Sequence, residues 1–201
     1  MSGFDQVVKL TEEEPLSRSL PAALRLATSL PDQAWAEWLR LEVMGYFNDN
    51  PSMNKGTVVP TYRSVPGEWH DEHGRPLVLT DPKLGFVNQI PLRYGVAELE
   101  AVAGKVEGSV AMRLPDQAQI IREVLKVEVS VFQFRPSSVA QVLTNIRLTA
   151  LDHLWARKTA LATLSAEGKL EKQEEIFLLR PAIWGVGLDL KALWRKTFRR
   201  R

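Results

Sequence analysis

The strongest hydrophobic pattern in the chain occupies residues 17–46, where apolar side chains recur at the spacing of an amphipathic helix. Pro31 divides this pattern into two segments, SRSLPAALRLATSL and PDQAWAEWLRLEVMGY. The pattern therefore predicts two short helices, followed by a return loop that closes on the sequence VVPTYR at residues 58–63. Small alanines on the first helix favour close packing against the second.

Each predicted helix starts near a residue that can cap its free backbone N–H groups. Ser19 is the expected N-cap of the first helix, and Pro21 would then lie in the first turn, where proline is tolerated. Asp32 is the expected N-cap of the second helix.

Glu42 is the unusual residue of the second helix because it lies within an apolar stripe. At about 100° per residue, Tyr46 falls close beside Glu42 on the helix surface, and Trp38 lies at the margin of the same stripe. A buried carboxylate is costly unless it is paired or protonated. Arg63, directly after Tyr62, is the nearest suitable partner along the chain, so we predict an ion pair between Glu42 and Arg63 beneath aromatic rings.

These residues also carry a family resemblance. A helix ending in E-x-x-G-Y and followed by P-x-Y-R is similar to the signature of the AbiTii domain of bacterial abortive-infection proteins, and a weaker similarity continues to about residue 165. The resemblance implies a role in anti-phage defence but brings no known set of catalytic residues. Its motif positions in this chain are Leu24 to Ala27, Trp38, Glu42, Gly45, Tyr46, Pro60, Tyr62 and Arg63.

Residues 47–93 break the helical pattern because prolines recur throughout them. Residues 68–70 and 75–80, joined by a polar turn, predict a β-hairpin, and residues 86–90 predict another short strand. Beyond them, the spacing predicts helices at 94–103 and 116–125, and strands at 109–113 and 127–135.

The longest predicted helix begins at Ser137 or Ser138 and reaches about Ala166. Its main apolar face leaves Leu148, Leu151 and Trp155 on other sides, so we expect this helix to pack on two sides. Together the elements predict an α+β fold. One mainly helical domain with a β-hairpin or small sheet spans residues 1–166, and a basic C-terminal extension spans residues 167–201.

The composition excludes several kinds of site. Hydrophobic residues make up 45% of the chain and charged residues 25%, which are ordinary values for a globular protein. The absence of cysteine excludes disulfides, cysteine–zinc sites and thiol catalysis. It fits a reducing cytosol, and since neither a signal peptide nor a long apolar span is visible, we expect a cytoplasmic protein.

The charge is unevenly distributed along the chain. The last eleven residues carry six basic side chains and no acid, and without them 20 basic residues face 24 acidic ones, a net charge of −4 for residues 1–190. Aromatic residues interleave with this basic tail, which would suit an anionic membrane surface, a nucleic acid, a partner protein, or docking of the tail on its own domain. The basic residues are Lys191, Arg195, Lys196, Arg199, Arg200 and Arg201.

Two groups outside the tail could carry chemistry. Glu42 beside Arg63 could be a tuned catalytic carboxylate, but a structural ion pair is the favoured interpretation because no second acid or histidine is tied to it by sequence. His70 and His73 could bind a metal or form an acid–base pair, but the polar tip of a hairpin is the favoured interpretation of them. His153 fits a hydrogen-bonded histidine at the edge of the core. We expect no cofactor and no metal.

Two functions from different classes follow. The favoured hypothesis is an interaction module of abortive infection that senses or binds a phage component or a host protein. The alternative is a toxic effector enzyme acting on nucleic acid or nucleotides, with Glu42, Arg63 and the hairpin histidines near its site. Self-association is left open.

Overall fold

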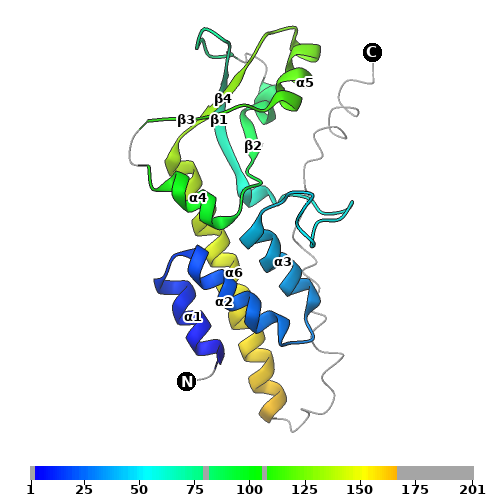
Figure 1. The fold of residues 1–201 in the computed structure, drawn as a ribbon, viewed down its shortest axis with the longest axis vertical. Helices are drawn as coiled ribbons and strands as arrows, with labels where there is room; N and C mark the ends of the chain where they lie inside the picture. Colours follow the sequence, from blue (N-terminus) through cyan, green and yellow to red (C-terminus); the bar gives the residue numbers. More distant parts are fainter. Residues whose placement is uncertain (1–2, 79–81, 106–107, 167–201) are drawn as a thin grey trace.

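The computed structural model describes residues 3–78, 82–105 and 108–166. The expected α+β class is confirmed, because one small antiparallel sheet lies at one end of the molecule and most of the helices lie at the other (Figure 1). Along the described chain the elements are α1 (Gly3–Glu13), α2 (Leu16–Thr28), α3 (Gln33–Met44), the 3-10 turn η1 (Thr61–Arg63), β1 (Ser64–His70), the 3-10 segment η2 (Pro82–Asn88), β2 (Gln89–Pro91), α4 (Val96–Ala103), β3 (Val110–Met112), α5 (Pro115–Leu125), β4 (Val131–Phe134) and α6 (Pro136–Ala166).

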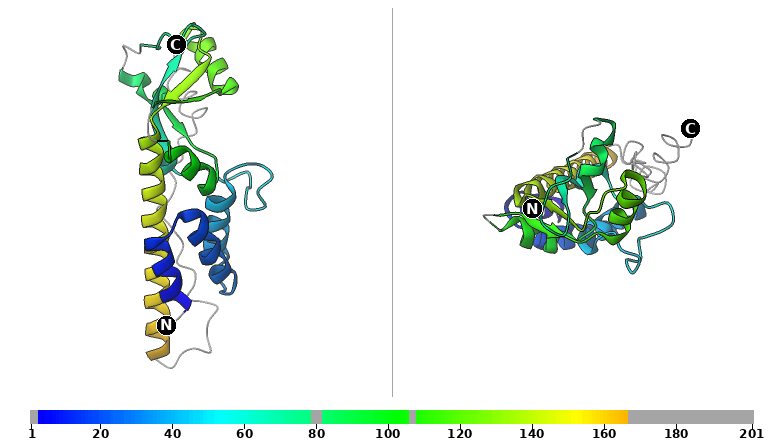
Figure 2. Two further views of the ribbon diagram at one scale, coloured as in Figure 1. Left: turned by 60° about the vertical axis from the view of Figure 1, so that its left-hand side comes forward. Right: turned by 90° about the horizontal axis from the view of Figure 1, so that it is seen from above.

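Helix α6 packs against both the other helices and the sheet. Its first turns leave the sheet, and the rest of the helix runs past α1, α2 and α3 (Figure 2). Two basic side chains of α6 contact the first helix. Arg147 donates to backbone carbonyls at the end of α1 and just beyond it, including that of Glu14 at 2.9 Å, and Lys158 forms an ion pair with Asp5 at 2.6 Å. These contacts attach α1 to α6, although the two helices are far apart in the sequence.

The sheet has the strand order β2-β1-β4-β3, with every neighbouring pair antiparallel. Trp69 of β1 lies opposite Phe132 of β4, with their ring centroids 5.3 Å apart. Pro91 is in the edge strand β2, where a missing N–H is tolerated, and Pro66 is in β1 beside β2, just beyond the residues that pair with β4.

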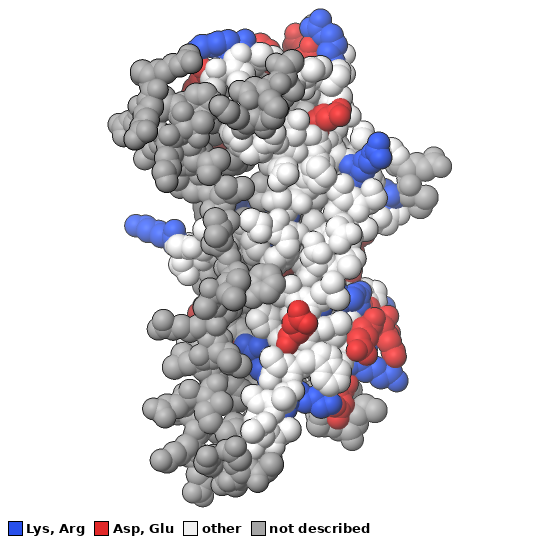
Figure 3. Space-filling view, turned by 180° about the vertical axis from the view of Figure 1, so that it is seen from behind, with Lys and Arg blue, Asp and Glu red and all other residues white. Residues whose placement is uncertain are grey.

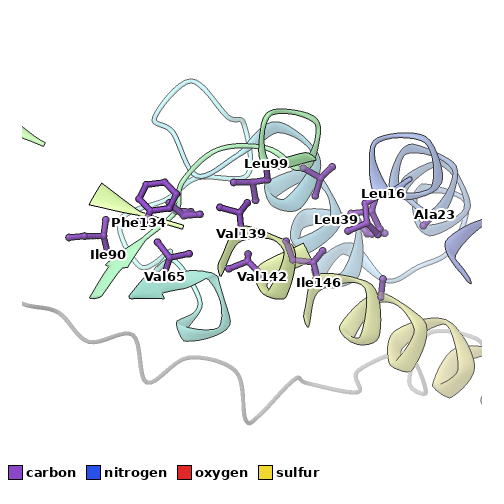
Figure 4. Packing of buried hydrophobic residues seen from close by; sticks show 14 of the residues in the cluster. Leu16, Ala23, Leu39, Val65, Ile90, Leu99, Phe134, Val139, Val142 and Ile146 are labelled. Atoms are coloured by element: carbon purple, nitrogen blue, oxygen red, sulfur yellow. The ribbon is translucent and has the colours of Figure 1, made fainter. Parts of the chain in front are cut away.

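The core runs from the helices into the sheet without a break. Figure 4 shows Leu39 and Ile146 at the helical end, followed by Val142 and Val139 of α6, and then Phe134 of the sheet. One continuous core joins the two parts, which indicates that they fold as one unit.

Helix α2 begins earlier than the sequence predicts. It starts at Leu16, so Pro21 lies inside the helix, and Ser19 is a buried helical residue rather than the N-cap. Glu100 of α4 explains the difference, because its carboxylate accepts hydrogen bonds from the backbone N–H of Leu16 at 2.6 Å and of Ser17 at 3.4 Å. A residue more than 80 positions away therefore caps the helix. In contrast, the predicted N-cap of α3 is confirmed, since Asp32 accepts from the N–H of Trp35 at 3.1 Å.

The strand predictions are only partly correct. The turn after β1 forms, but among the described residues its return arm makes one isolated bridge, His70 to Pro76, on the edge of β1 opposite β4. Most of the predicted strand 86–90 belongs to η2, and only the last residues of the predicted strand 127–135 form β4. Strand partners distant in sequence decided these boundaries.

Helix α6 also differs from its prediction in two respects. It begins at Pro136, because proline is favoured in a first turn, and neither Ser137 nor Ser138 is its N-cap. Leu148 and Trp155 are 55% and 45% exposed, so the prediction that they pack against a second element is wrong for the part of the chain described, whereas Leu151 is partly buried against the core.

The predicted C-terminal extension, 167–201, lies outside the described residues. Within those residues, no helix combines the length and the hydropathy required to cross a membrane.

Candidate functional site

The C-terminal end of α3 presents Glu42 and Tyr46 on the same side. They are four residues apart, and the Tyr46 hydroxyl donates to Glu42 Oε1 at 2.8 Å. Gly45 ends the helix between them with φ of +89°, a conformation that favours glycine. A Cβ at this position would lie 2.6 Å from the carbonyl oxygen of Arg93, which accepts from the Tyr46 N–H at 2.7 Å. The E-x-x-G-Y pattern thus describes a helix end pressed against the segment before α4.

Glu42 is completely enclosed by donors. Oε1 accepts from Tyr46 and also from the Tyr62 hydroxyl at 2.7 Å, and Oε2 accepts from Arg63 Nη1 at 2.5 Å. Neither Glu42 nor Arg63 has any exposed side-chain surface. The predicted ion pair is present, and Trp38 extends it by donating from Nε1 to the Tyr62 hydroxyl at 3.0 Å. We call these residues the clamp: Trp38, Glu42, Tyr46, Tyr62 and Arg63.

Arg63 links the return loop to a third segment. Its Nε donates to the carbonyl of Leu92 at 3.0 Å, and its Nη2 donates to that of Tyr94. Its guanidinium lies over the Tyr46 ring, 4.9 Å from the centroid. Each of the three guanidinium nitrogens of Arg63 therefore donates to a group inside the protein, which is the geometry of a structural anchor.

Burial sets the protonation of the clamp tyrosines. Loss of solvent, and then the nearby charge of Glu42, raise the pKa of Tyr46 and of Tyr62 well above the usual range. Both hydroxyls therefore stay protonated and act as donors to the carboxylate at physiological pH.

A small pocket lies over the clamp, between α3, α6 and the return loop. Its volume is about 170 Å³. The pocket lining is mostly aromatic and apolar, and it includes Trp35, Trp38, Tyr46, Val58, Tyr62 and His153. We call it the aromatic pocket.

A second polar network, which was not predicted from the sequence, lies beside this pocket. Arg157 donates from Nε to Asp32 Oδ2 at 2.7 Å, and its Nη2 lies 2.5 Å from the same oxygen. Arg157 also lies over the Trp35 ring, 4.5 Å from the centroid. Asp32 thus caps α3 with one oxygen and holds α6 with the other. Asp32 could be recognised in the sequence as an N-cap acid. Its partner Arg157 could not, because the two residues are 125 positions apart.

His153 belongs to the same network, in agreement with its interpretation as a hydrogen-bonded boundary histidine. Its Nδ1 lies 3.0 Å from Arg157 Nη1, and its ring packs on Trp38 with centroids 4.9 Å apart. Burial, and then the charge of Arg157, lower the pKa of His153 to about 4. The imidazole is therefore neutral at physiological pH. Because arginine can only donate, Nδ1 is the acceptor and the ring proton is on Nε2.

A larger groove adjoins the aromatic pocket on the other side of the return loop. Its volume is about 590 Å³, and Val58 lines both cavities. Residues of β2 and the start of α5 form the far side of this groove, whose exposed apolar residues include Val58 and Tyr94.

The hairpin histidines are far from the clamp. His70 ends β1 whereas Arg63 precedes it, so the strand separates them by roughly 20 Å. His70 Nδ1 lies 3.0 Å from the carbonyl of Gly74, and Asp71 closes the turn by accepting from the His73 N–H at 2.9 Å. The structure therefore does not bring these histidines together with Glu42. Within the described ranges, no three His, Asp or Glu side chains are close enough to hold one metal ion.

The clamp carries the residues that resemble a family signature, and a comparison with family models matches AbiTii over residues 9–174. The chain belongs to the AbiTii family. The name of the AbiTii family refers to abortive infection, a form of anti-phage defence. Searches among curated proteins and among solved structures found no match. AbiTii membership therefore supports the defence role, whereas the molecular activity has to be argued from the clamp and its surroundings.

The basic tail predicted as a binding segment, from Lys191 to Arg201, lies outside the described residues.

Proposed function

We propose that this AbiTii protein acts in abortive infection as an interaction module, which binds a phage component or a partner protein through the surface around the return loop. One observation carries the proposal: both oxygens of Glu42 are occupied by donors from within the protein, and the side chain has no exposed surface. An acid held in this way positions the loop and the helix end; it is not available to a substrate.

The surface that the clamp holds in place supports binding. The return loop lies between the aromatic pocket and the larger groove, and Val58 is 49% exposed where the two meet. Concave apolar surface with a few polar groups is typical of recognition sites. The clamp would then fix the shape of this surface in advance of binding.

The charged side chains visible on one face favour a protein partner over a nucleic acid there. On the reverse face shown in Figure 3, acidic and basic side chains lie mainly toward the two ends, and the stretch between them carries few of either. A nucleic-acid interface requires a concentration of basic side chains. The described residues visible on this face show no such concentration of basic side chains.

Phage plating tests the proposal with a matched pair of variants. Val58→Asp places a charge between the two cavities, and we expect it to abolish protection without lowering the melting temperature. Val78→Asp makes the same change at a position that is 77% exposed and lines neither cavity, and it should protect like the wild type. Full protection by the Val58 variant would refute the proposal.

A biochemical assay tests the enzymatic alternative directly. Purified protein is incubated with RNA, DNA and nucleotides, with and without Mn²⁺. We expect no turnover. Turnover that Glu42→Gln abolishes while the variant stays folded would establish an effector enzyme and overturn the module.

A further inference from the structure

The charged groups around the aromatic pocket are already paired within the protein. Arg157, in its wall, is neutralised by Asp32, and Glu42, behind the two tyrosines, is neutralised by Arg63. Among the described residues that line the pocket, an anionic ligand would therefore find no unpaired cation, and a cationic ligand would find no unpaired carboxylate. The electrostatics favour a neutral occupant, and the aromatic walls favour a ring.

The pocket nevertheless offers directional hydrogen bonding. Arg157 fixes the tautomer of His153, which leaves the Nε2–H as a donor. Trp35, also in the wall, has an Nε1–H that is buried without an acceptor among the described residues. A buried donor without a partner is unusual in a folded protein. The Trp35 nitrogen has almost no surface open to the pocket, so His153 Nε2–H is the donor that calls for an occupant with a hydrogen-bond acceptor.

The size of the pocket limits the occupant further. Its volume of about 170 Å³ is below the roughly 300–1,000 Å³ of pockets that enclose whole small molecules. It matches a single side chain, and the groove that shares Val58 could hold the neighbouring residues of the same polypeptide. Energetically dominant contacts between proteins are commonly aromatic side chains in such pockets.

We propose that the aromatic pocket receives a tyrosine side chain of a partner protein, whose ring packs against Trp38 and Tyr62 and whose hydroxyl accepts a hydrogen bond from His153 Nε2–H. Tyrosine is neutral, planar and both donor and acceptor at its tip. This assignment rests on the proposed binding function and names the chemistry that the surface recognises.

The imidazole resonances of His153 provide the test, read by NMR during titration with N-acetyltyrosinamide. The chain has three histidines, and His70 and His73 on the distant turn serve as internal references. We expect saturable shifts at His153 alone. N-acetylphenylalaninamide should bind roughly tenfold more weakly, because it lacks one hydrogen bond. O-phosphotyrosine and n-butylguanidinium should not bind. Val58→Asp should abolish the shifts and Val78→Asp should preserve them.

Three results would overturn this assignment: no saturable shift at His153, equal affinity for the phenylalanine analogue, or tighter binding of either charged probe. These measurements use purified protein and do not depend on plating. Failure of the tyrosine assignment is therefore distinguishable from failure of the proposed function, which depends on the protection conferred by the Val58 variant.

Discussion

Glu42 and Arg63 form an ion pair, 2.5 Å long, in which neither side chain has exposed surface. Removing one member of such a pair leaves an uncompensated buried charge, at a cost of about 3–5 kcal/mol. We expect Glu42→Ala and Arg63→Ala each to lower the melting temperature strongly. Arg122→Ala is the control, because Arg122 and Glu128 form an exposed pair, and such pairs contribute about 1 kcal/mol or less. A clamp variant that melts like the wild type but loses protection would show that the pair is a functional site.

Asp32 should stabilise the fold through two separate contacts, the cap of α3 and the ion pair with Arg157. Asp32→Ala removes the cap of α3 and leaves Arg157 unpaired in the interior, so we expect a loss of about 3–5 kcal/mol in denaturant unfolding. Asp32→Asn keeps one acceptor oxygen, enough to cap α3, but it removes the counter-charge of Arg157 and turns the second oxygen into an NH2 donor. Its loss should therefore be smaller than that of Asp32→Ala only by the contribution of the cap, about 1 kcal/mol. Equal losses in the two variants would contradict the double role.

Gly45 is expected to tolerate no side chain. Gly45→Ala would place a Cβ 2.6 Å from the Arg93 carbonyl at a φ of +89°, and both the strain and the contact oppose it. Gly74→Ala is the matched control, with a φ of +78° and open space around it, so it should cost only about 1 kcal/mol. Thermal unfolding should therefore rank Gly45→Ala as the more damaging change.

The low pKa of His153 predicts acid sensitivity. In the folded protein its pKa is about 4, while the unfolded chain has the ordinary value of 6.5, so the unfolded state binds more protons between these values. The stability that His153 contributes is complete above pH 6.5 and is lost as the pH falls toward 4, by up to about 3 kcal/mol. Arg157, Asp32 and Asp152 are the charged groups that influence it. The free energy of unfolding, measured across this pH range, should depend less on pH in His153→Gln than in the wild type. An equal pH dependence in the two proteins would contradict the prediction.

The basic tail gives a prediction that depends on the sequence alone. Deleting residues 191–201 removes six basic side chains from a chain whose remainder carries −4. We expect the shortened protein to fold and to bind anionic liposomes or nucleic acid more weakly than the full chain, whose binding should fall steeply as salt rises. An insoluble shortened protein would instead favour docking of the tail on the domain, and equal, salt-independent binding would exclude an electrostatic role.

The sequence alone was sufficient for the clamp pair and for the presence of most helices, although not for all of their ends. Glu42 in an apolar stripe required a counter-charge, and Arg63 was the nearest suitable one along the chain, so burial together with the motif after the loop predicted the contact. The α3 cap was equally local, since Asp32 bonds an N–H three residues later. Local sequence determines such features because helix periodicity and capping act over one or two turns.

Only the tertiary structure decided the features whose partners are distant in sequence. Glu100 moved the start of α2 to Leu16, and β1 obtained its longest pairing from β4, more than 60 residues away in sequence. The link from Asp32 to Arg157, and with it the aromatic pocket, spans 125 residues. No local pattern encodes which of several acids meets which arginine, because that choice depends on how α6 packs across the other helices. Periodicity therefore determined which side chains needed partners, and the packing of α6 determined which partners they obtained.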